Sequence, residues 1–176
     1  YNSISNVIIE GNNEIIGKNY VGLAVGENDL NAQALSLIVE GNVSGNNFVG
    51  GLIGQNYRGT VKGAYKNGSV LGTGNYVYRT GYEDTATTQV IANKDITVNG
   101  TKTASTTLDS SNGESIAGDL FDNINTYEYT IDTYIGGDNN NDGYYLDYNN
   151  NNNLVFMEVK EETPLTGSGT IEDPYL

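Results

Sequence analysis

Short apolar runs, each ended by Gly or Asn, recur at a regular spacing along the first half of the chain. The segment Val7–Asn12 recurs 30 residues later as Leu37–Asn42. The segment Tyr20–Asn28 recurs 28 residues later as Phe48–Asn56, and Ala64–Gly72 is a weaker third copy. Runs of this length, rich in β-branched residues and broken by turn formers, are typical of strands. A repeat of about 27–30 residues therefore predicts a parallel β-solenoid, in which each turn needs a neighbour to bury its apolar face.

Stacking of successive turns would bring equivalent side chains to about 4.8 Å from one another. We expect Leu52 to point into the core, and we expect Asn28 and Asn56 either to adopt left-handed conformations or to stack as an amide ladder. Glu10 falls over Glu40, and because stacked carboxylates repel, this corner is either solvated or holds a cation. The expected aliphatic stacks are Val7 over Leu37, Ile9 over Val39 and Val21 over Val49.

The second copy resembles a known motif. Residues 48–56, followed by Gly59-Thr60-Val61 and by Tyr65–Val70, are similar to the GLUG motif of bacterial surface proteins and adhesins, which also occurs in non-catalytic regions of immunoglobulin A1-cleaving metallopeptidases. The resemblance implies a right-handed β-helix and an extracellular setting at the cell surface. The first copy departs from the pattern at Leu23-Ala24, where the family has Gly-Leu. Residues 76–81 depart as well, so we expect the repeat to decay after Val77.

The second half of the chain is less regular. Residues 95–99 alternate between polar and apolar side chains and predict an exposed strand that ends at Asn99-Gly100. Apolar residues at 116, 120, 121 and 124 predict one short amphipathic helix ending near residue 125. Alternation predicts strands over 127–135 and 154–159, and Tyr144-Tyr145-Leu146 resembles the final strand of GLUG-containing proteins. The expected organisation is a solenoid over 1–82, an irregular β-rich closing segment of the same module over 83–162, and a linker with an opening motif over 163–176.

Composition removes several classes of function. The 176 residues include 8 Lys and Arg against 22 Asp and Glu, a formal net charge of −14, which argues against binding to nucleic acid. The chain has no His and no Cys, so it cannot form a His-based triad, a thiol nucleophile or a zinc finger. No long apolar run is present, and we therefore expect no membrane insertion.

One motif carries candidate metal chemistry. The segment Asp138–Gly143 matches the first half of a calcium-binding loop, in which oxygen ligands alternate and a Gly makes the sharp turn. The twelfth loop position holds Asn149 instead of Glu, so binding would be weak and structural. The alternative is a solvated Asp-Gly hairpin turn. The predicted Ca²⁺ ligands are Asp138, Asn140, Asp142 and Asp147.

Two classes of function compete. The first is a non-catalytic structural or adhesive module of an extracellular bacterial surface protein or fibre, or the non-catalytic region of a surface metallopeptidase. Its partners would be copies of itself or adjacent modules, and a host or cell-surface glycan or protein. The second is a calcium-dependent β-helix polysaccharide lyase, for which Arg58 and Arg79 are the only guanidinium candidates. We favour the non-catalytic class, because nothing in the sequence brings these arginines close to Asp138 and Asp142.

The end of the chain suggests how modules continue. Residues 167–176 resemble the sequence that opens many bacterial surface β-helix modules, so an opening motif stands at the end of the chain. We therefore expect head-to-tail continuation, in which residues 166–176 pair with the first turn of the next module or subunit. Contacts of this kind do not close on themselves, and separate chains would form filaments.

Overall fold

The computed structural model describes residues 2–84, 86–103, 111–116, 144–148 and 154–158. Every regular element in these ranges is a β-strand, and none of them is a helix. The strands are β1 (Ser3–Ile9), β2 (Glu14–Ile16), β3 (Asn19–Val21), β4 (Val25–Asp29), β5 (Gln33–Gly45), β6 (Asn47–Gly50), β7 (Ile53–Tyr57), β8 (Thr60–Gly72), β9 (Val77–Tyr78), β10 (Tyr82–Asp84), β11 (Thr87–Asn93), β12 (Thr97–Val98), β13 (Thr101–Lys102), β14 (Glu114–Ile116), β15 (Tyr144–Tyr148) and β16 (Leu154–Glu158).

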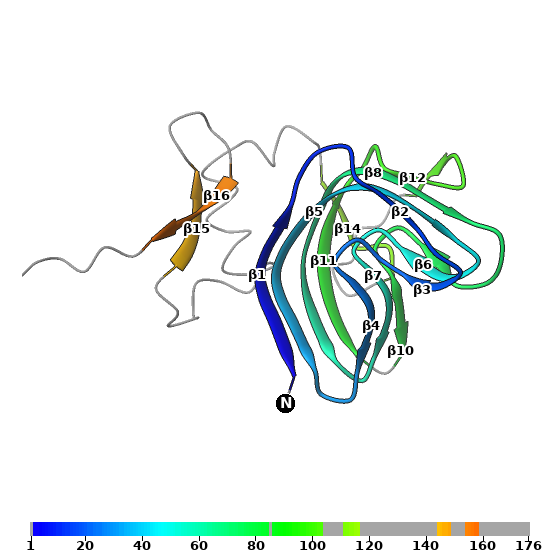
Figure 1. Ribbon diagram of the computed structural model, residues 1–176. Helices are drawn as coiled ribbons and strands as arrows, with labels where there is room; N and C mark the ends of the chain where they lie inside the picture. Colours follow the sequence, from blue (N-terminus) through cyan, green and yellow to red (C-terminus); the bar gives the residue numbers. More distant parts are fainter. Residues whose placement is uncertain (1, 85, 104–110, 117–143, 149–153, 159–176) are drawn as a thin grey trace, which may run out of the picture.

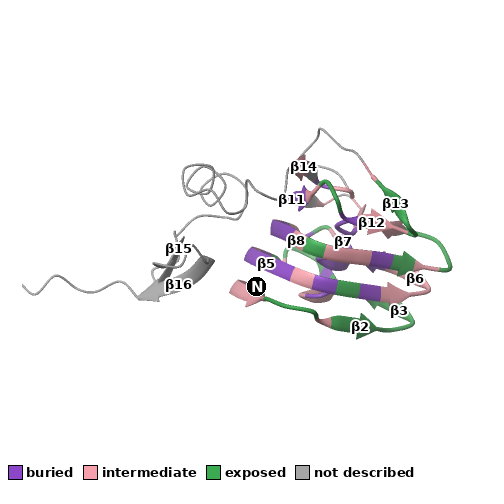
Figure 2. Ribbon diagram, turned by 90° about the horizontal axis from the view of Figure 1, so that it is seen from above, coloured by how far each residue is buried: buried purple, intermediate pink, exposed green. Residues whose placement is uncertain are grey.

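Strands from successive turns stack in parallel and form a β-solenoid of roughly three turns. The largest sheet has the order β1-β5-β8-β11-β14, and two smaller sheets have the orders β3-β6-β9 and β4-β7-β10. Figure 1 shows β1, β5 and β11 side by side in one wall, with β4, β7 and β10 in the opposite wall. Figure 2 shows buried positions concentrated on β5 and β8, whereas β2 is exposed. The predicted all-β parallel solenoid is therefore confirmed.

The register between turns follows the sequence repeat. All three expected aliphatic stacks are confirmed, including Val21 on Val49. The difference between the offsets of 30 and 28 arises at the corner between β1 and β2. The chain takes five steps from Ile9 to Glu14, whereas the second turn takes only three steps between their partners Val39 and Asn42. The third copy aligns as the sequence predicted, with Gly41 paired to Gly68, Val43 to Val70 and Gly45 to Gly72.

The expectation that the repeat decays after Val77 is wrong for the backbone. Val77 pairs with Val49 and Tyr82 pairs with Gln55, so the third turn is complete. Strand β11 then adds to β8, and β14 adds to β11, which carries parallel pairing beyond residue 82. Ladder hydrogen bonds join backbone groups and do not require the motif's side chains. The loss of the motif therefore ends the sequence repeat without ending the solenoid.

The second half agrees only in part with its predicted elements. The strand expected over 95–99 is shortened to β12, which pairs in parallel with β8 and forms a hairpin with β13. It was expected to be exposed, but Ile96 is buried because its side chain joins the core cluster. The strand predicted over 154–159 is confirmed as β16, which pairs in antiparallel fashion with β15. The predicted strand over 127–135 and most of the predicted helix lie outside the described residues, and Ile116 belongs to β14.

The solenoid core depends on one glycine opposite one aromatic ring. The Tyr65 side chain is fully buried, and its hydroxyl donates a hydrogen bond to the Gly41 carbonyl oxygen at 2.7 Å. A Cβ atom on Gly51 would overlap the Tyr65 ring, so this position must be glycine. The first turn has Leu23-Ala24 where the second has Gly51-Leu52, which places the large side chain one residue earlier. This exchange explains the departure of the first copy from the motif.

Candidate functional site

The strands of the first turn leave one face of the solenoid open, which we call the N-terminal face. Strands β1 and β2 pair with β5, β3 pairs with β6, and β4 pairs with β7. Within the described ranges, none of these four strands has a partner on its other side. Unpaired parallel edges carry backbone donors and acceptors that a further strand can use. The N-terminal face is therefore the part of the described solenoid best suited to binding another chain segment.

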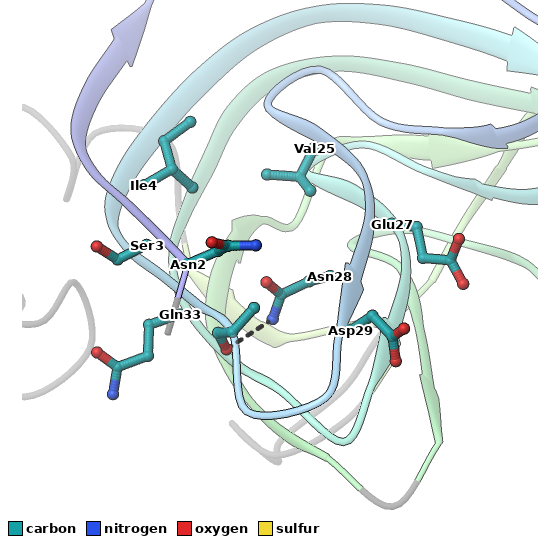
Figure 3. A pocket seen from close by; sticks show the side chains of 9 residues that line it. Asn2, Ser3, Ile4, Val25, Glu27, Asn28, Asp29 and Gln33 are labelled. Carbon is teal, nitrogen blue, oxygen red and sulfur yellow. Dashed lines mark hydrogen bonds between the residues drawn. The ribbon is translucent and has the colours of Figure 1, made fainter.

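A shallow pocket of about 310 Å³ opens on this face between β1 and β4. Figure 3 shows Asn2 and Asn28 on the inner side of β4, whereas Glu27 and Asp29 point away from it on the outer side. Amide and aliphatic groups thus dominate the interior of the pocket, and the carboxylates do not converge there. The lining residues are Asn2, Ser3, Ile4, Val25, Glu27, Asn28, Asp29, Ala32 and Gln33.

An asparagine ladder runs through the core beneath this pocket. The Asn28 amide nitrogen donates to the Asn56 side-chain oxygen at 2.9 Å, and it also lies 3.2 Å from the Ala32 carbonyl oxygen. Both asparagines are buried. Of the two conformations predicted for this pair, the structure has the amide ladder. Glu83 occupies the equivalent position in the third turn, so the asparagine ladder ends there.

An aromatic ladder runs beside the asparagine positions at the corner between β2 and β3 and its equivalents. The Tyr20 and Phe48 rings stack at 4.8 Å with an interplanar angle of 8°, and the Phe48 and Tyr76 rings stack at 4.7 Å. All three residues have positive φ angles of 53–61°, which bulky residues rarely adopt. Sequence reasoning missed this ladder, although the signal was present as an aromatic residue at the same place in each copy.

The corner that holds Glu40 contains a cation supplied by the protein itself. Lys66 Nζ lies 3.3 Å from Glu40 Oε1, and the Gly11 amide donates to Glu40 Oε2 at 3.1 Å. The carboxylate is thus paired between turns, and no metal is needed to explain how it is tolerated beside Glu10. Among the residues that the structure describes, no group of three metal-binding side chains comes together.

The two arginines do not form a common site. Arg79 is fully buried, with Nε donating to the Asn112 carbonyl oxygen at 2.6 Å and Nη2 donating to the Gly113 carbonyl oxygen at 2.8 Å. Its Nη1 has no hydrogen-bond partner, and burial lowers the pKa of Arg79 to about 10. Arg58 lies over the Tyr57 ring at 5.0 Å, in a different and exposed environment. Arg79 is therefore placed to hold the fold and cannot meet a polysaccharide from solvent.

The predicted calcium loop lies outside the described residues. Asp138, Asn140 and Asp142 belong to the masked range 117–143, and Asp147 lies in β15, where only the backbone is described. The calcium site therefore stays a prediction. In the described part of the chain, no helix is both long and apolar enough to cross a membrane. Comparison of the chain with protein-family models, with curated proteins and with solved structures found no match in any of the three.

Proposed function

We propose that this chain is a non-catalytic structural module of an extracellular bacterial surface protein or fibre. The observation that carries the proposal is the register of the turns, which stack through β5, β8 and β11 while the N-terminal face stays open. Backbone hydrogen bonds join each turn to the next, so the solenoid can act as a stiff spacer that grows by about 4.8 Å per turn. The similarity of residues 48–56 to the GLUG motif supports the surface setting.

Cell-surface display is tested by labelling intact source cells with an antibody against the chain. The expected result is labelling without permeabilisation and loss of the signal after external protease treatment. Labelling that requires permeabilisation would contradict the extracellular assignment. Incubation with calcium and uronate polysaccharides is expected to release no unsaturated products. Their release, with loss on Arg58→Ala, would favour the lyase alternative.

Head-to-tail continuation is tested by sedimentation of two chains. The full chain is expected to form concentration-dependent oligomers, because residues 166–176 would pair with the N-terminal face of a neighbour. A chain ending at Leu165 is expected to stay monomeric. Equal behaviour of the two chains would remove residues 166–176 from the proposed contact.

A weakly bound structural Ca²⁺ at Asp138, Asn140, Asp142 and Asp147 remains part of the proposal. Ligand that binds only the native state raises the free energy of unfolding by about 2.7 kcal/mol at a hundredfold excess over Kd. We therefore expect millimolar calcium to raise the melting temperature above that measured with chelator. Identical melting curves, also unchanged by Asp142→Ala, would remove calcium from the account.

A further inference from the structure

We infer that the N-terminal face accepts one further turn of this same repeat, and that Asn19, Tyr20 and Asn28 select it. The inference deepens the head-to-tail proposal and rests on it, because it specifies the chemistry of the turn that continues the solenoid. The incoming turn has an aromatic residue over Tyr20 and asparagines over Asn19 and Asn28. Three features of the face carry this inference: its open edges, its uncovered ring and the polarity of its two amides.

The open edges determine the direction of the incoming turn. Three separate sheets end at this face, in β1 with β2, in β3 and in β4. Each of these strands runs parallel to its partner in the second turn. A single extended segment could satisfy only one of these edges. A complete turn that follows the same path satisfies all three, as the second turn already does on the opposite side.

The aromatic ladder is closed at one end and open at the other. Phe48 is covered on both faces, by Tyr20 and by Tyr76. Beyond Tyr76 the ladder ends against Tyr82, whose ring is tilted by 49° at a centroid distance of 4.5 Å. Tyr20 contacts only Phe48 among the described rings and is 42% exposed. Its free face offers an incoming aromatic ring the same offset stacking that Phe48 receives.

The two amides at this face have opposite hydrogen-bonding polarity. The Asn19 oxygen accepts from the Asn47 amide nitrogen at 3.2 Å, which leaves the Asn19 nitrogen as a donor toward an incoming turn. Asn28 uses its nitrogen toward Asn56, Ala32 and Thr60, which leaves its oxygen as an acceptor. An asparagine supplies both a donor and an acceptor, so it fits either position.

The same three positions identify the occupant as a turn of this repeat. Asn47, Phe48 and Asn56 recur in the second turn with the same spacing as Asn19, Tyr20 and Asn28. A neutral sugar could use the Tyr20 ring, but it would not pair with the backbone edges of β1 and β4. An unrelated strand could pair with one edge, but it would not continue the two ladders. Only a turn with this spacing satisfies edges, ring and amides together.

The test adds a turn to the full chain. A copy of residues 33–59 is placed directly before Ser3, which occupies the same register position as Gln33 and Thr60. We expect the melting temperature to rise by about 5 °C or more, because each added turn contributes its own stability and one more interface. Backbone amides of β3 and β4 are expected to gain protection from hydrogen exchange. The matched control carries the same copy with Phe48→Ala and Asn56→Ala inside it, and it is expected to retain less than half of the rise.

Three outcomes would overturn the inference. No rise with the intact copy would mean that the face does not accept a turn. Equal rises with the intact copy and with its control would mean that backbone pairing alone decides, without selection by the ladders. A melting shift caused by cellohexaose and lost on Tyr20→Ala would assign the face to a sugar. Each outcome is independent of cell-surface labelling and of the sedimentation of the unmodified chain, so failure here is distinguishable from failure of the proposed function.

Discussion

The two ends of the solenoid are built from the same repeat but finish it differently. At the N-terminal face the ladders stop with Tyr20 and Asn28 still able to bind another turn. At the other end the repeat's residues are replaced, with Glu83 at the asparagine position and Arg79 at the position of Gly51. The difference teaches that a few substitutions decide whether a turn of this solenoid is extended or closed.

Closure at the second end depends on residues 111–113, which lie over the third turn. The Thr80 and Gly81 amides donate to the Ser111 carbonyl oxygen at 3.1 Å, and the Thr80 hydroxyl donates to the same oxygen. Arg79 donates to the next two carbonyl oxygens from within the core. Strand β14 then pairs with β11. The backbone groups of the third turn are thus satisfied by a segment that does not belong to the repeat.

The largest expected effect compares a leucine between two turns with a leucine at the open face. Leu52 is 0% exposed, and Leu52→Ala is expected to lower the free energy of unfolding by about 2–5 kcal/mol. Leu23→Ala in the first turn should cost less, because Leu23 is 7% exposed and has a neighbouring turn on only one side. Urea unfolding of both variants measures the difference. A cost below about 0.5 kcal/mol for Leu52→Ala would contradict its place in the core.

Removal of Arg79 tests the closed end. Arg79→Ala deletes two hydrogen bonds made by a buried charged group, and we expect a loss of about 2–4 kcal/mol of stability. Hydrogen exchange at the Thr80 and Gly81 amides should accelerate more than exchange in β5. Arg58→Ala is the matched control and should change stability by less than about 0.5 kcal/mol, because Arg58 is exposed. Unchanged exchange at Thr80 in Arg79→Ala would show that Arg79 does not hold the closing segment.

A smaller effect separates the two members of the asparagine ladder. Asn56 lies between Asn28 and the third turn, so Asn56→Ala leaves the Asn28 donor without its closest acceptor inside the core. We expect a loss of about 1–3 kcal/mol. Asn28→Ala at the open face should cost less, because solvent can reach the pocket above it. Equal losses would mean that the two ladder positions are equally enclosed and would remove this contrast between the ends.

The smallest effect is expected at the β12–β13 hairpin, away from both ends. Lys102 Nζ pairs with Asp95 Oδ1, and this hydrogen bond, with the ammonium charge, lowers the pKa of Asp95. A carboxyl whose pKa is depressed by folding contributes stability above its unfolded pKa, and this stability is lost as pH falls through the folded pKa. Lys102→Met should therefore raise the Asp95 pKa toward its ordinary value in an NMR titration, with little change in stability because both side chains are exposed. An unchanged titration would show that the pair does not persist in solution.

Parts of the fold could be predicted because the repeat itself encodes register. Equal spacing of Val7 and Leu37, or of Val21 and Val49, is enough to place one turn over another. The closing segment could not be predicted in this way. Arg79 reads as a charged departure from the motif, and its burial depends on Asn112 and Gly113, which lie more than 30 residues later and outside the repeat.

For the candidate site the balance is similar. The asparagine ladder was one of two alternatives open from sequence, because Asn accepts both left-handed and stacked conformations. Its choice required the 2.9 Å approach of Asn28 to Asn56. The cation beside Glu40 was expected as an alternative to solvent, but that it is Lys66 depends on the packing of β8 against β5.

The sequence by itself determined that this protein is an all-β parallel solenoid, because short apolar runs repeated at a constant offset can bury their faces only by stacking on one another. The tertiary structure alone decided where the stack ends. Backbone edges are identical in every turn, and only contacts between distant segments determine which edge is covered. Residues 111–113 cover the third turn through Arg79 and Thr80, whereas Tyr20 and Asn28 leave the first turn open.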